Sequence, residues 1–186
     1  DGTVDLTVSL TAPSSGYQVT TDSFEVGAFE EVEICTVIRA EPHEDEVLGW
    51  FDRIEILSSE GSHHMNVMIG QFSFLDAFTG DGSSAAALGL EEGQYPCDEI
   101  DYMESLFPVF PSQRAYQEVT LPDGVAAPLL VPALLVFSHH YINPTEDTLL
   151  VNAAINFHTV APETVIDVAS IVFDSINELE IPAGSQ

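Results

Sequence analysis

The stretch FEEVEICTVIRA, residues 29–40, alternates apolar and polar side chains along much of its length, as a half-buried β-strand does. The stretch TVDLTVSL, residues 3–10, has the same period. Its apolar side chains fall on one face of a strand: Val4, Leu6, Val8 and Leu10. Along the chain, apolar residues recur at every second position more often than at every third or fourth, which predicts sheets rather than helices.

Further short runs are rich in β-branched and aromatic residues and are separated by turn signals. They read RIEILS, HMNVMIGQFSF, LLVFSHHYI, LLVNAAINFHTV, VIDVASIVF and NELEIPA. NPTEDT (143–148) predicts a hairpin connection, LPDGV (121–125) a Pro-Asp-Gly turn, and FTGDGSSAAALGLEEGQYP (78–96) one long loop with a short helical turn at its alanines. Residues 1–186 are therefore predicted to form one all-β domain, an antiparallel two-sheet β-sandwich of jelly-roll type.

The charge of the chain restricts its partners. Its 186 residues include 31 Asp and Glu and three Arg with no Lys, for a formal net charge of −28. Nucleic acid is excluded as a partner and anionic membranes are disfavoured, because phosphate contacts need clustered Lys and Arg. Such a surface attracts cations and suits a saline or calcium-containing exterior. A solvated acidic coat is the simpler interpretation; DAFTGDGSS (76–84) has oxygen ligands for calcium but lacks the spacing and closing Glu of an EF-hand.

Two features favour export to an extracellular or periplasmic location. The chain begins at Asp1 without a methionine, as a mature protein does after loss of a signal peptide, or as a trimmed chain does. Its two cysteines, Cys35 and Cys97, would most simply form a disulfide in an exported domain, with two buried thiols as the alternative. No apolar run reaches the 18 or so residues that span a bilayer, and Pro128 and Pro132 interrupt APLLVPALLVF.

Two pairs of adjacent histidines lie on predicted strands far apart in the sequence. His63 and His64 belong to SHHMNVMIG, and His139 and His140 to LLVFSHHYI. Three imidazoles are a ligand set that suits copper or zinc. Successive side chains of a flat strand point to opposite faces, so an adjacent pair shares one ion only where its strand bends or bulges. Metal binding and hydrogen-bonded surface or core histidines are both consistent with the residues alone.

The remaining two histidines are not expected at such a site. If NPTEDT closes a hairpin centred between Thr145 and Glu146, His158 lies about seven residue rises, roughly 23 Å, from His140 along the sheet. His43, in the acidic stretch EPHEDE, is expected to be a solvated loop residue.

Several motifs follow one another in a fixed order. They are CTVIRA, SHHMNVMIG, PCDE, LPDGVAAPL, LLVFSHHYINP and INELEIPAG. Together, from about residue 30 to residue 184, they resemble the first of the two sandwich domains in the copper- and ascorbate-dependent monooxygenases, the family of peptidylglycine α-hydroxylating monooxygenase and dopamine β-monooxygenase. SHHMNVMIG is similar to the family's His-His-Met strand, LPDGVAAPL to its Leu-Pro-x-Gly-Val turn, and LLVFSHHYINP to its strand ending in His-Tyr.

The resemblance implies a ligand set. His63, His64 and His140 correspond to the three ligands of the family's histidine-only copper, which serves electron transfer. His140 is selected over His139 because His140 directly precedes Tyr141. The implied cofactor is therefore one copper ion.

The resemblance also pairs Cys35 with Cys97, and it has limits. Met65 follows the histidine pair as in the family, where it is not an ordinary ligand, and we interpret it as packing with Met68. The family's catalytic copper binds a His-x-His pair and a methionine in a second domain, whereas this sequence has no His-x-His and no methionine after Met103. Hydroxylation by the family's mechanism is not expected from this chain alone.

Three functions of different kinds stay open. The preferred one is an exported copper-binding β-sandwich domain with a mononuclear three-histidine site that transfers electrons to a redox partner. The second is a structural or adhesive subunit of an extracellular assembly, joined through edge strands such as residues 3–10. The third is the amino-terminal half of a two-domain copper monooxygenase. The sequence has no nucleophile elbow or Gly-rich phosphate loop that would indicate another enzyme.

Overall fold

A computed structural model describes residues 2–40, 48–70, 91–100, 106–130 and 133–170. Several predictions concern residues outside these ranges. They are the solvated His43, the calcium-like stretch 76–84, most of the long loop with its alanine turn, and the strand NELEIPA. Among the described residues, no helical segment has the length and apolar content needed to cross a membrane.

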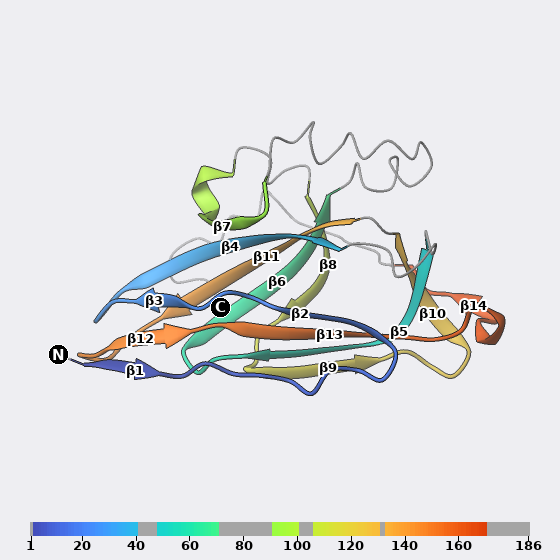
Figure 1. The fold of residues 1–186 in the computed structure, drawn as a ribbon, viewed down its shortest axis with the longest axis horizontal. Coiled ribbons are helices and arrows are strands. Elements are labelled where there is room, and N and C mark those ends of the chain that lie inside the picture. Colours follow the sequence, from blue (N-terminus) through green and yellow to red (C-terminus); the bar gives the residue numbers. More distant parts are fainter. Residues whose placement is uncertain (1, 41–47, 71–90, 101–105, 131–132, 171–186) are drawn as a thin grey trace, which may run out of the picture.

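The described residues form three sheets of β-strands (Figure 1). The five-stranded sheet has the order β7 (Gly93–Pro96), β4 (Glu31–Ala40), β11 (Ala133–Ile142), β6 (Ser62–Gly70), β8 (Leu106–Ser112). The six-stranded sheet has the order β14 (Asp167–Val168), β10 (Val125–Leu130), β5 (Leu48–Ser58), β13 (Ala153–Thr159), β2 (Gly16–Thr20), and β9 (Tyr116–Thr120) also pairs with β5. The small sheet has the order β1 (Thr3–Asp5), β12 (Thr148–Val151), β3 (Phe24–Val26). Two short 3-10 helices, η1 (Cys97–Glu99) and η3 (Pro162–Thr164), are the helical elements of this part of the chain.

The two larger sheets face each other and enclose the main core (Figure 1). Its fully buried side chains come from both sheets and include Ile56, Ile155, Phe157, Val67, Leu135 and Phe137. The predicted all-β sandwich is confirmed. The third sheet was not predicted; it packs through Leu149 and Val151 against Tyr141 of β11. Two described pairs, β1 with β12 and β10 with β14, are parallel rather than antiparallel.

Two predicted elements are wrong in part. In TVDLTVSL only Thr3–Asp5 forms a strand, because farther along the side chain of Asn152 replaces the backbone ladder: its Oδ1 accepts the Val8 N–H at 2.7 Å and its Nδ2 donates to the Val8 carbonyl at 3.1 Å. NPTEDT does not close a hairpin, because β11 pairs with β4 and β6 while β12 pairs with β1 and β3. The side chain of Asn143 organises this connection instead, accepting the Thr145 N–H and donating to the carbonyls of residues 26, 27 and 147.

The outer face of the five-stranded sheet carries a second apolar cluster. Its buried members are Cys35, Val37, Met68, Cys97, Ile100, Leu106, Leu134 and Val136. A disulfide joins Cys35 on β4 to Cys97 in η1, as predicted. The bond holds η1 over this face, and disulfides are typical of oxidising environments. The expected contact between Met65 and Met68 does not form. Met65 belongs to the core between the sheets, and Met68 belongs to the outer cluster.

Strand β11 places its two adjacent histidines in different environments. His139 lies on the inner face and is fully buried, with the ring of Phe24 edge-on at 6.3 Å between centroids. Within the described part of the chain, neither of its ring nitrogens has a hydrogen-bond partner. Desolvation lowers the pKa of His139 from 6.5 to about 4, so this imidazole is neutral in the folded protein near pH 7.

Replacing both Cys35 and Cys97 with alanine should lower the free energy of unfolding by about 4 kcal/mol, because the bond restricts the unfolded chain over a separation of 62 residues. Urea denaturation without reductant measures this loss. Reductant should destabilise the wild type by a similar amount and leave the variant unchanged. Equal stabilities of the oxidised wild type and the variant would contradict the prediction.

Replacing His139 with leucine should stabilise the metal-free protein near pH 7, because it removes two unpaired buried nitrogens. The difference in stability between the leucine variant and the wild type should grow as the pH falls from about 6.5 to about 4. In this window the unfolded wild type takes up a proton that the native state does not, so wild-type stability is present above pH 6.5 and is lost toward pH 4. Denaturation curves of both proteins across this window should diverge by about 3 kcal/mol; parallel pH profiles would show that His139 is not the group responsible.

Candidate metal centre

An irregularity in β6 brings two adjacent histidines to one face of the sheet. In the pairing of β6 with β11, His64 lies opposite His140 and Ser62 lies opposite Tyr141, so His63 is an extra residue without a partner on β11. This is the arrangement of a β-bulge, which breaks the alternation of side chains at one position. The sequence predicted that the pair could converge only at such a bend.

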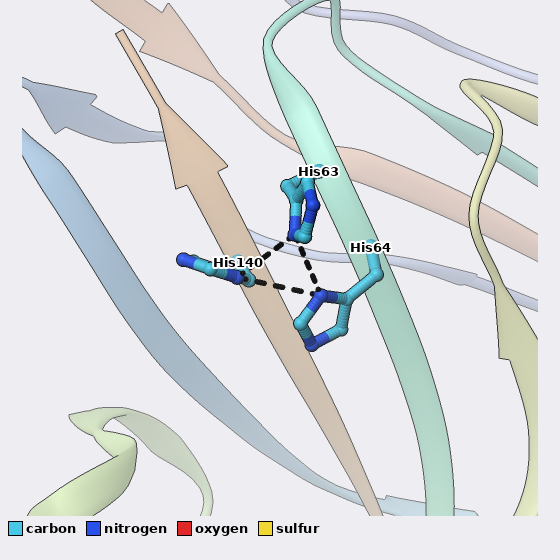
Figure 2. Close-up of side chains that lie close together, drawn as sticks. All are labelled: His63, His64 and His140. Atoms are coloured by element: carbon cyan, nitrogen blue, oxygen red, sulfur yellow. Dashed lines mark hydrogen bonds between the residues drawn. The ribbon is translucent and has the colours of Figure 1, made fainter. Parts of the chain in front are cut away.

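The three predicted ligands converge between β6 and β11 (Figure 2). The Nδ1 atom of His63 lies 3.1 Å from Nδ1 of His64 and 3.3 Å from Nδ1 of His140, and the His64 and His140 Nδ1 atoms are 3.3 Å apart. The group lies on the outer face of two inner strands of the five-stranded sheet. His63 is exposed, and His64 and His140 are half-buried.

This triangle of nitrogens cannot be satisfied by hydrogen bonds alone. A ring nitrogen of imidazole either carries a hydrogen or presents a lone pair. With three nitrogens and two states, at least two of the three must be in the same state, so one short contact always sets lone pair against lone pair or hydrogen against hydrogen. A cation between the three nitrogens removes the conflict, because it accepts all three lone pairs at once.

The dimensions of the triangle fit one metal ion. Three nitrogens with these separations have a common centre about 1.9 Å from each, close to the zinc–nitrogen bond length of about 2.0–2.1 Å. The three histidines could therefore hold a metal ion through their ring nitrogens. His63 is exposed, so solvent reaches the group on that side.

A carboxylate fixes the orientation of His140. The Nε2 atom of His140 lies 2.8 Å from Oε1 of Glu31 on the neighbouring strand β4. Nε2 therefore donates its hydrogen to Glu31, and Nδ1 of His140 keeps its lone pair for the cluster. A carboxylate behind a histidine ligand is a common arrangement in metal sites, because it fixes the tautomer and raises the basicity of the ligand. The next residue on the same face of β4, Glu33, lies opposite His140 in the ladder and accepts a hydrogen bond from Ser138.

The charge state of the cluster favours metal ligation. Burial is the main cause that lowers the pKa of His64 below 6.5, the charge on His140 lowers it further, and Glu33 opposes the shift. A lowered pKa keeps this imidazole neutral, which is the form that binds a metal.

The other predicted placements can be compared with the structure. His139 points into the core, so His140 is the residue of this pair that joins the cluster. His158 is not part of the cluster: it lies on β13 in the six-stranded sheet, between Arg53 and Glu55. That outcome agrees with the prediction, although the hairpin on which the argument depended does not form.

Glu31 and Glu33 are the residues that sequence reasoning missed. The sequence shows that these two glutamates alternate with apolar residues along one predicted strand. Nothing in the sequence, however, showed that Glu33 would face His140 across the ladder.

A comparison with models of protein families found no match for this chain, and neither did a comparison with curated proteins. The site is therefore interpreted from its own geometry.

Replacing Glu31 with alanine should weaken metal binding about tenfold, the lower end of the range for partners of ligating histidines, because Glu31 is 64% exposed and its bond is partly screened. Glu31→Gln keeps an acceptor for the His140 hydrogen and should therefore reduce the metal affinity less than Glu31→Ala does. Isothermal titration with Cu(II) measures both. Glu60→Ala is the matched control, since it removes an exposed carboxylate just before β6. An equal loss in Glu60→Ala would indicate a general charge effect instead of the specific bond.

Proposed function

We propose that this protein is an exported copper-binding β-sandwich domain with one mononuclear site formed by His63, His64 and His140. The observation that carries the proposal is the triangle of Nδ1 atoms at 3.1–3.3 Å, which hydrogen bonding leaves in conflict and which one cation resolves. The disulfide between Cys35 and Cys97 supports an oxidising location.

Copper is the metal that the ligand set favours. Three neutral imidazoles bind copper and zinc well, and among divalent first-row metals such sites usually bind Cu²⁺ most tightly. Glu31 and Glu33 place negative charge beside the ligands, which favours Cu(II) over Cu(I) and lowers the reduction potential. Copper bound there would supply one-electron chemistry, and we propose electron transfer as the role of the site.

We also propose a relationship to the first domain of the copper- and ascorbate-dependent monooxygenases. The residues that carry this resemblance lie on the same face of the five-stranded sheet: the bulged His-His pair, the histidine before Tyr141, and the disulfide on β4. Hydroxylation in that family needs a second copper, for which this sequence has no His-x-His pair. The proposal for this chain is accordingly limited to binding copper and passing electrons.

The wild type should bind one Cu(II) per chain in isothermal titration. His140→Ala should reduce the affinity by more than the roughly 100-fold that marks the loss of an outer partner, because it removes a ligand itself. The variant with alanine at residues 63, 64 and 140 should keep only weak binding to surface carboxylates. Affinity should also fall as the pH drops through about 6.5, since protons compete for the imidazoles.

His158→Ala is the matched control for these variants. It also removes one imidazole, but from the six-stranded sheet. Copper affinity should stay at the wild-type value. If the wild type and the triple alanine variant bind copper equally well, the three-histidine site does not exist.

A further inference from the structure

A strained aromatic residue lies two positions before Glu31, the carboxylate bonded to His140. Phe29 has a φ of 56°, and it is the one described residue other than glycine with a positive φ. It is the third residue of a turn closed by the Glu30 N–H on the carbonyl of Gly27 at 3.1 Å. Turns of this kind take glycine at the third position, because a Cβ atom is disfavoured at positive φ. The ring of Phe29 is also 69% exposed.

Several hydrogen bonds hold this turn in place. The Phe29 N–H donates to the carbonyl of Thr145 at 3.1 Å, and the carbonyl of Glu30 accepts the Asn143 N–H at 2.9 Å. The Glu30 carboxylate accepts the Gly27 N–H at 2.6 Å, and the Asn143 side chain donates to the Gly27 carbonyl at 2.8 Å. Surrounding contacts thus maintain an unfavourable backbone conformation that presents an aromatic ring to solvent. Conformations of this kind are concentrated at functional sites.

A second exposed apolar side chain lies between this turn and the copper ligands. Ile142 is 39% exposed and follows His140 by two residues on β11, so both side chains are on the same face, about 7 Å apart along the strand. In the ladder Ile142 lies opposite Glu31, the carboxylate bound to His140. Phe29 precedes Glu31 by two positions in the sequence.

These residues define what we call the Phe29–Ile142 patch: an apolar centre formed by Phe29 and Ile142, with the exposed carboxylates of Glu30, Glu31 and Glu33 beside it. Exposed aromatic side chains with a preset conformation lose little entropy on binding and are frequent energetic centres of interfaces. The carboxylates, in a chain with a net charge of −28, select a partner of opposite charge.

We propose that the Phe29–Ile142 patch is the docking surface for a basic redox protein that has an apolar contact area ringed by Lys or Arg. This inference rests on the proposed copper site, which it supplies with a partner. In the docked pair one electron passes: Cu(I) is oxidised to Cu(II), and the redox group of the partner is reduced by one electron. Docking next to His140 keeps the path between the two redox groups short.

The test uses cytochrome c, a basic haem protein, as the probe, and titrates it into the copper-free protein. Phe29→Gly should weaken the binding of cytochrome c about tenfold, as expected for the loss of an aromatic interface centre. The same variant should be at least as stable as the wild type in thermal unfolding, because glycine adopts the positive φ without steric conflict. Loss of binding without loss of stability separates docking from a structural role of Phe29.

Two controls complete the experiment. Val168→Thr removes another exposed apolar side chain, on β14 of the six-stranded sheet, and should leave cytochrome c binding unchanged. Polylysine measures the charge contribution alone and should bind the wild type and Phe29→Gly equally. Equal cytochrome c affinities of the wild type and Phe29→Gly would overturn the proposal.

Because these titrations need no copper, their result is independent of the copper-binding test. With the copper-loaded protein, Phe29→Gly should slow the reduction of ferric cytochrome c by Cu(I) without changing copper affinity. Unchanged copper binding in the triple alanine variant together with Phe29-dependent docking would refute the copper site and leave the docking surface standing.

Discussion

The extra residue at His63 is the constraint on which the candidate site depends. A regular strand would direct the His63 side chain to the inner face, where Met65 and Val67 pack in the core, and only His64 would face His140. The bulge interrupts the ladder at one position, and it places three Nδ1 atoms within 3.3 Å of one another. Three like nitrogens so close together have no favourable arrangement of hydrogens. A cation between them would remove this conflict.

The five-stranded sheet supports this site from both faces. On its inner face, β6 and β11 contribute side chains to the core between the sheets, and this packing fixes the position of the strands that carry the ligands. On its outer face, the disulfide from β4 to η1 covers the apolar cluster next to Ser138 and Glu33. Ligands on central, doubly packed strands are held more rigidly than ligands on loops. Such rigidity suits the proposed role in electron transfer.

Glu31 connects the histidine cluster with the strained turn at Phe29. Glu31 belongs both to the candidate metal site, through its bond to His140, and to the Phe29–Ile142 patch, through its position opposite Ile142. The turn that begins at Gly27 and the connection that begins at Asn143 hold each other in place, so Phe29 is presented rigidly beside the ligands. A partner that docked on this patch would change the surroundings of Glu31, and with them the hydrogen bond that orients a copper ligand.

Much of this protein follows from the sequence alone, because the two-residue period of the strands decides which side chains share a face. That period predicted the sandwich, the number of cysteines predicted their pairing in a disulfide, and the resemblance of a motif selected His140 over His139 as a ligand. Local patterns could not determine which strands lie side by side, since a ladder depends on the packing of the whole sheet. For this reason the predicted hairpin at NPTEDT and the predicted contact between Met65 and Met68 are wrong, and the contribution of Glu31 was missed. The bulge at His63 was identified as a requirement for a shared site, but only the tertiary structure, with β6 held between β11 and β8, decided that the strand has one.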